Sequence, residues 1–92
     1  MTNCSSLLTL CRRALDTWGA DAQIDQCIEE MAELTVELQH HKRGREHHAA
    51  EEIADVLICA QQMRLLVGPD EVDVEVRRKL WRLGQRLDGV AA

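Results

Sequence analysis

The sequence predicts an all-α protein, a four-helix bundle that assembles into homo-oligomers. Apolar residues recur at three- and four-residue steps through most of the 92-residue chain, which is the period of an amphipathic helix. Tyr and Phe are absent and apolar/polar alternation is poor, which excludes an all-β domain. The length allows one domain, residues 1–92, and such a short chain buries only about 60 to 65% of its unfolded surface. Self-association is therefore expected.

Two helices are expected in the first half of the chain. The first spans residues 4–18, and Gly19 ends it. Its apolar stripe consists of Cys4, Leu7, Leu8, Cys11, Ala14, Leu15 and Trp18. The second spans residues 21–42, with Asp21 as the expected N-cap. Its expected core stripe consists of Ile24, Cys27, Ile28, Met31, Leu34 and Leu38.

Two further helices are expected in the second half. The third spans residues 46–67 and ends at the Gly68–Pro69 pair. Its expected core positions are Ala49, Ile53, Val56, Cys59, Ala60, Met63 and Leu66. The fourth spans residues 70–87, and residues 89–92 are expected to fray. Its main apolar side holds Val72, Val76, Leu80, Leu83 and Leu87. Val74 and Trp81 lie on its opposite side and suggest a partner surface.

Composition indicates which cellular compartment and which classes of binding partner to expect. The formal net charge of −5 argues against an electrostatic grip on DNA or RNA. The longest apolar run, residues 56–60, is too short to span a bilayer, and no secretory signal is visible. The four cysteines form no C-x-x-C pair and lie on apolar helix faces. We expect reduced, buried thiols in a cytoplasmic protein, with neither a membrane nor a polymeric nucleic acid as partner.

Four carboxylates do not fit an ordinary solvated helix face. At about 100° per residue, Glu30 lies at the edge of the second helix's apolar arc, and Glu33 extends the same flank. On the third helix, Glu52 projects inside the apolar arc and Asp55 lies at its border. Each central helix is therefore expected to turn a carboxylate pair toward the interior.

Grouped carboxylates repel one another and need a partner cation, a metal ion or a proton. The second helix offers no Lys or Arg before Lys42, and the third offers only Arg64. A hard divalent cation, Mg²⁺ or Mn²⁺, is the simplest partner for oxygen ligands. The alternatives are solvated or salt-bridged carboxylates, and a di-iron site. The di-iron design needs Glu-x-x-His on two helices, and only Glu37 and His40, at a helix end, have that spacing.

Two acidic motifs carry a family resemblance. The string EEMAEL (residues 29–34) and the string EEIADVL (residues 51–57) resemble the first and second acidic motifs of the MazG-like all-α nucleoside triphosphate pyrophosphatases. The family pattern is E-x-x-E, a variable spacer, then E-x-x-D. Here 18 residues separate Glu33 from Glu52. The resemblance covers residues 24–66, and the outer helices match only in architecture.

The resemblance implies an enzyme. MazG-like proteins cleave a nucleoside triphosphate between its α and β phosphates with Mg²⁺, giving a monophosphate and pyrophosphate. They remove non-standard or surplus nucleotides, sometimes dUTP or dCTP, and assemble as dimers or tetramers with sites near subunit interfaces. Carried over by position, the metal ligands and catalytic carboxylates are Glu30, Glu33, Glu52 and Asp55. Glu37, one turn beyond Glu33, is a further catalytic candidate that orients water or helps a second metal, or is a surface residue.

Substrate-binding candidates lie outside the two motifs. The connection of residues 39–48 holds all four histidines with Lys42 and Arg45, which either close over the phosphates or form a solvated hairpin tip. Trp18 is either a core residue or a base-stacking platform. The cations available on the last helix are Lys79, Arg82 and Arg86. That helix has no Asn, which many family members use there. The rival to an enzyme is a noncatalytic helical bundle that binds nucleotides or a partner and keeps the carboxylates as a regulatory metal site.

Overall fold

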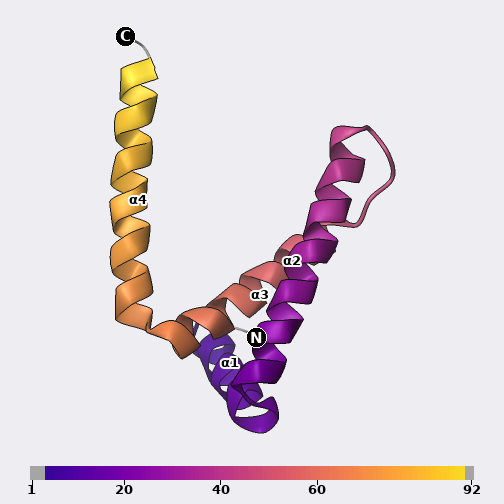
Figure 1. Cartoon of the computed structure of the whole chain (residues 1–92), viewed down its shortest axis with the longest axis vertical. Coiled ribbons are helices and arrows are strands. Elements are labelled where there is room, and N and C mark those ends of the chain that lie inside the picture. Colours follow the sequence, from indigo (N-terminus) through magenta and orange to yellow (C-terminus); the bar gives the residue numbers. More distant parts are fainter. Residues whose placement is uncertain (1–3, 91–92) are drawn as a thin grey trace.

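The computed structural model describes residues 4–90 and contains four helices and no strand within that range (Figure 1). They are α1 (Cys4–Trp18), α2 (Ala20–Lys42), α3 (Ala49–Val67) and α4 (Pro69–Val90). The expected all-α class is confirmed, and the bounds of α1 are those predicted from its apolar stripe. Residues 91 and 92, part of the segment expected to fray, lie outside the described residues.

Four helix ends differ from the sequence prediction, namely the starts of α2, α3 and α4 and the end of α4. Helix α4 ends at Val90 instead of residue 87, so residues 89 and 90 of the segment expected to fray are helical. Gly19, with a φ of 89°, is the N-cap of α2 and no side chain caps that end, so the assignment of Asp21 as N-cap is wrong. Asp21 lies in the first turn, where its charge still favours the helix dipole. Helix α3 begins at Ala49 instead of residue 46. Helix α4 begins at Pro69, whose missing N–H costs nothing at a first helical position.

Helices α2 and α3 form an antiparallel hairpin, and α1 packs against both near the start of α2. The thiols of Cys27 and Cys59 meet across the hairpin. Cys11 anchors α1 to α3, since its Sγ donates a hydrogen bond to the Ile58 carbonyl oxygen at 3.8 Å. These three cysteines are free and buried, as predicted, and the side chain of Cys4 lies outside the described residues.

Helix α4 projects away from the other three helices (Figure 1). Within residues 4–90 it packs only against α3. The guanidinium of Arg64 on α3 donates hydrogen bonds to both carboxylate oxygens of Asp73 on α4, at 2.8 and 2.7 Å. This ion pair links α4 to α3 near the turn between them. The radius of gyration is 16.1 Å, against roughly 12 Å for a compact chain of this length. One chain therefore does not close the expected four-helix bundle.

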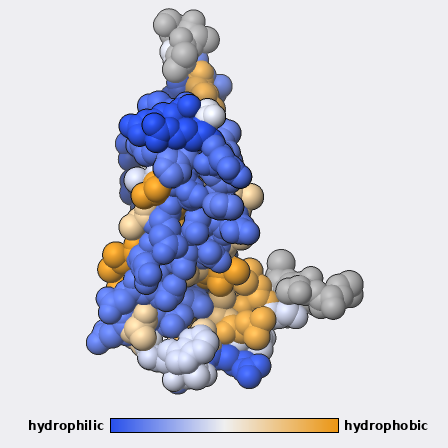
Figure 2. All heavy atoms as spheres, turned by 90° about the vertical axis from the view of Figure 1, so that its right-hand side faces the viewer, coloured by the Kyte–Doolittle hydropathy of each residue, from blue (hydrophilic) through white to orange (hydrophobic). Residues whose placement is uncertain are grey.

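Half of the predicted core positions whose burial is described are exposed and only four are buried, so that part of the prediction is wrong for a single chain. Among residues 6–89, the buried ones are Cys11, Cys27, Ala49, Cys59, Gln23 and Gln62. Large apolar side chains on all four helices remain exposed, and they include Leu10, Trp18, Ile28, Met31, Ile53, Leu57, Val76, Leu80, Trp81, Leu83 and Leu87. Figure 2 shows such hydrophobic residues on the surface, gathered mainly toward the base of the molecule. The chain exposes 7258 Å², about 1,900 Å² more than the roughly 5,400 Å² typical of its mass.

No helix in the described part of the chain combines the length and the apolar character that crossing a bilayer requires.

Candidate metal centre

Three of the four predicted carboxylates meet between α2 and α3. Glu30 and Glu33 come from α2 and Glu52 from α3, and one oxygen of each lies within 4.8 Å of the others. The antiparallel hairpin produces this meeting, because it sets the middle of α2 beside the first turns of α3. The E-x-x-E spacing places its two carboxylates on neighbouring turns of one helix face. The predicted convergence of the two acidic motifs is present for these three residues.

Two carboxylate oxygens in this cluster lack a protein partner. Glu30 and Glu52 are half-buried, and the Oε2 atom of each is buried and accepts no hydrogen bond from any described residue. The other oxygen of Glu30, Oε1, accepts a hydrogen bond from Gln26 Nε2 at 2.8 Å, which orients the carboxylate. A buried, unpartnered carboxylate oxygen is costly unless a cation or a proton satisfies it. The donor set, oxygen only and negatively charged, fits Mg²⁺ or Mn²⁺.

The raised pKa values in the cluster are consistent with a site that needs a cation or a proton. The pKa of Glu52 is raised to about 7, first by burial, then by its hydrogen bond with Glu30, and then by the charges of Glu33, Glu30 and Asp55. Partial loss of water around the carboxylate of Asp55, and the neighbouring Glu30, also raise the pKa of Asp55. Without a cation, the cluster therefore retains a proton near neutral pH. A divalent ion would displace that proton and neutralise the repulsion.

Asp55 and Glu37 do not occupy the places expected for them. Asp55 is exposed beside Glu30, lines the cavity and lies outside the three-oxygen group. Glu33 is also exposed, so the cluster opens to solvent instead of lying in a dry interior. Glu37 accepts a hydrogen bond from the His48 backbone N–H at 2.9 Å, and its other oxygen lies 3.4 Å from His40 Nδ1. In this structure, Glu37 therefore holds the start of α3 against α2.

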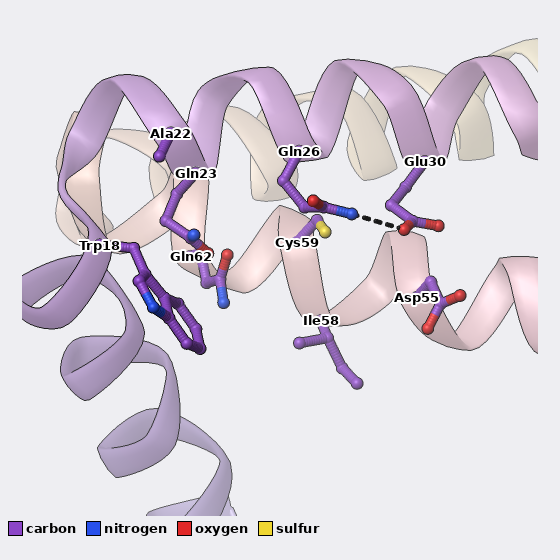
Figure 3. Close-up of a pocket in the computed structure, with 9 residues that line it drawn as sticks. All are labelled: Trp18, Ala22, Gln23, Gln26, Glu30, Asp55, Ile58, Cys59 and Gln62. Atoms are coloured by element: carbon purple, nitrogen blue, oxygen red, sulfur yellow. Dashed lines mark hydrogen bonds between the residues drawn. The ribbon is translucent and has the colours of Figure 1, made fainter.

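A cavity of about 570 Å³ extends from the acidic cluster toward the end of α1 (Figure 3). Glu30 and Asp55 line one end, and Trp18 lies at the other. Trp18 is 66% exposed, so its interpretation as a core residue is wrong for the single chain. The complete lining is Trp18, Ala22, Gln23, Gln26, Glu30, Asp55, Ile58, Cys59 and Gln62.

Sequence reasoning missed the glutamines of this cavity. Gln23 and Gln62 are each only 7% exposed, although glutamine is normally a surface residue. The available signal was their position at helical spacing from buried cysteines: Gln23 precedes Cys27 by four residues and Gln62 follows Cys59 by three. Cys59 also lines the cavity. Burial, then the neighbouring Cys27 thiol, then the carboxylates of Glu30 and Asp55 raise the pKa of Cys59 to about 11, so it is a protonated, unreactive thiol.

The predicted cationic residues lie elsewhere. Lys42 and Arg45 are exposed at the far end of the α2–α3 hairpin, and no Lys or Arg of the described chain lines the cavity. Beside them, His41 Nδ1 and His47 Nε2 share a hydrogen bond of 2.9 Å. The cations on α4 line a separate hollow of about 250 Å³ together with Leu83, and they are Lys79, Arg82 and Arg86.

Comparison with known proteins identifies no relative of this chain. No protein-family model, no curated protein and no solved structure matches this chain.

Proposed function

We propose that this chain is a Mg²⁺-dependent nucleoside triphosphate pyrophosphohydrolase of the MazG-like type. It would add one water across the α–β anhydride of a ribo- or deoxyribonucleoside triphosphate, releasing a monophosphate and pyrophosphate. The observation that carries the proposal is the convergence of Glu30, Glu33 and Glu52 from two helices, with two buried oxygens unpartnered, next to a cavity that Glu30 lines. The E-x-x-E and E-x-x-D strings support it. Nucleotide-pool housecleaning in the cytoplasm, where free thiols persist, is the accompanying role.

The carboxylates would hold the metal, Mg²⁺ or Mn²⁺. Glu30, Glu33 and Glu52 supply the ligands, and Asp55 lies near enough to Glu30 to join them. When bound, the ion supplies charge neutralisation at the triphosphate and acidifies a water molecule. Gln26 fixes one oxygen of Glu30 and leaves the other directed to the cluster. Glu52 releases its proton when the site is loaded, so loading is linked to pH.

The order of groups along α2 fits a triphosphate. The cavity and Trp18 lie on one side of the carboxylates, and the cationic hairpin end lies on the other. Lys42 is nine residues beyond Glu33, roughly 14 Å along the helix axis. A nucleotide bound with its base in the cavity would direct its β and γ phosphates toward Lys42 and Arg45.

A second copy of the chain completes the proposed enzyme. The exposed apolar side chains of α2, α3 and α4 have no cover in one chain, and the excess area of about 1,900 Å² exceeds the roughly 800 Å² that each partner buries in a standard interface. A homodimer or homotetramer would cover these faces. The projecting α4 of one copy would then be free to bring Lys79, Arg82 and Arg86 toward the carboxylates of another.

The rival function is a noncatalytic bundle that binds a nucleotide or a partner protein and uses the carboxylates as a regulatory metal site. One observation favours it: the cavity-lining residues include no Lys or Arg that would stabilise charge on a departing pyrophosphate. Turnover separates the two functions, because only the enzyme releases pyrophosphate.

The test is a panel of ribo- and deoxyribonucleoside triphosphates with Mg²⁺ or Mn²⁺, read by pyrophosphate release. Glu52→Gln removes a cluster ligand, and Glu51→Gln, an exposed neighbour on the same helix, is the matched control. The proposal predicts turnover by the wild type and by Glu51→Gln, and a loss of at least 100-fold in Glu52→Gln. Metal-dependent thermal stabilisation without turnover of any nucleotide would favour the noncatalytic bundle.

A further inference from the structure

The proposed catalytic chemistry does not use the side chain of Gln62. Gln62 is 7% exposed, it lines the cavity, and its Oε1 atom is buried without a hydrogen-bond donor among the described residues. A buried amide oxygen without a donor costs free energy in the free protein. Such a group at the wall of an open cavity fits a ligand that brings its own N–H.

The surroundings of Gln62 indicate what kind of ligand this is. Figure 3 shows Gln62 extending from α3 toward Gln23 on α2, with the Trp18 indole beside them. Gln23 is buried to the same degree. Two amides and one large aromatic ring, in a cavity that apolar Ala22 and Ile58 also line, suit a flat heterocycle that has a hydrogen-bonding edge. No charged side chain lines this end of the cavity within the described residues.

The amide side chains of Gln23 and Gln62 lie at about the length of one nucleoside from the acidic cluster. Gln23 precedes Glu30 by seven residues on α2, and Gln62 follows Asp55 by seven residues on α3. Seven residues of helix advance roughly 10 Å, so both helices set the amides at the same distance from the carboxylates. That distance is comparable with the length of a nucleoside from its 5′ oxygen to the edge of its base.

We propose that the Trp18–Gln62 end of the cavity is a nucleobase subsite, in which Gln62 Oε1 accepts a hydrogen bond from an N–H on the Watson–Crick edge of the base. This inference rests on the proposed function, because the carboxylates would bind the phosphates through the metal. The Gln62 amide group offers a donor next to its acceptor, so it complements a base edge that has an N–H beside an acceptor. Trp18 packs against the face of the base, and Gln23 closes the subsite from α2.

In this subsite, recognition of the base depends on one N–H donor of the base, which pairs with Gln62 Oε1. A base that lacks the N–H leaves Gln62 Oε1 unsatisfied in the complex, which is the situation that buried polar sites reject most strongly. By contrast, a base-free polyphosphate would bind only through the metal and the cations. Gln62 is therefore a specificity residue in this account and has no part in breaking the anhydride bond.

The experiment measures binding with matched ligand pairs by NMR titration of the ¹⁵N-labelled wild type. Uridine is compared with 3-methyluridine, and cytidine with pyrimidin-2-one riboside, since each second member lacks the edge N–H. Mg²⁺ with inorganic tripolyphosphate is the base-free probe. A preference of about 5- to 150-fold for the N–H member of each pair is expected, the range for one good edge contact. Equal affinity within both pairs overturns the proposal without any variant.

Two variants test the assignment to Gln62 itself. Gln62→Met keeps the length of the side chain and removes the acceptor, and it should abolish the preference while leaving tripolyphosphate binding unchanged. Gln61→Met is the matched control, because Gln61 Oε1 is also buried and unpartnered but Gln61 does not line the cavity. A preference that survives Gln62→Met, or that Gln61→Met also removes, contradicts the assignment. Selective nucleoside binding without pyrophosphate release would sink the proposed enzyme and leave the subsite standing.

Discussion

The linkage between metal binding and pH gives the sharpest prediction from this structure. Glu52 has a folded-state pKa of about 7, raised from an ordinary value of 4.5, mainly by burial and by Glu30. A carboxyl group must lose its proton to bind Mg²⁺. For a pKa of about 7, the ionised fraction rises about tenfold between pH 6 and pH 8. The affinity for Mg²⁺ should therefore rise about tenfold over the same range.

The metal-free protein should show the opposite trend. Because the folded-state pKa of Glu52 lies above its unfolded value, the stability that this group contributes is fully present below about pH 4.5 and is lost as the pH rises through about 7. Metal-free protein should be less stable at pH 8 than at pH 5.5, and saturating Mg²⁺ should reverse that order. A crossing of the two stability curves is the signature of this mechanism.

The assay is isothermal titration with Mg²⁺ at half-unit steps from pH 6 to pH 8, together with thermal melting with and without the metal. Glu52→Gln should bind Mg²⁺ weakly at every pH and show a smaller metal-free pH dependence, which then comes from Asp55. Glu51→Gln, which changes an exposed neighbour, should behave as the wild type. An Mg²⁺ affinity that is flat from pH 6 to pH 8, or equal effects of the two variants, would refute the reasoning.

Three further predictions follow from the fold. Gly68 has a φ of 142°, which an L side chain rarely adopts, so Gly68→Ala should lower the free energy of unfolding by about 1 kcal/mol or more. In the same chemical denaturation assay, Gly84→Ala, within α4 and in open space, should raise it by roughly 0.5 kcal/mol. Arg64→Met removes both hydrogen bonds to Asp73, so hydrogen exchange should accelerate along α4 and leave α2 unchanged. In sedimentation velocity the wild type should run as a dimer or larger, and Leu80→Glu should shift it toward monomer; a monomeric wild type at micromolar concentration contradicts the assembly.

Helix content was the most predictable property, since it depends on local periodicity and on Gly and Pro as stops. Gly19 and Gly68 end α1 and α3 at the residues that the sequence indicated. The start of α3 was placed three residues too early, because Glu46 and His47 are compatible with a helix by composition. In the structure, Glu37 and His47 bind backbone N–H groups there and stabilise a non-helical entry. The contact with Glu37 comes from a residue 11 positions away and leaves no local pattern.

Burial was the least predictable property. A stripe of apolar residues such as Ile28 and Met31 indicates that a helix face will be covered, but not whether the same chain covers it. The projecting α4 leaves such stripes open in the single chain. For the acidic cluster, helical angles were sufficient for Glu30, Glu33 and Glu52 and failed for Asp55, whose border position could face either way.

The decisive measurement is a crystal structure grown with Mn²⁺ and analysed for anomalous scattering. The account predicts an anomalous peak within ligand distance of Glu30, Glu33 and Glu52, with the two unpartnered oxygens turned to it. No peak at saturating Mn²⁺, with the three side chains hydrated separately, would contradict the metal centre and remove the basis of the proposed hydrolase.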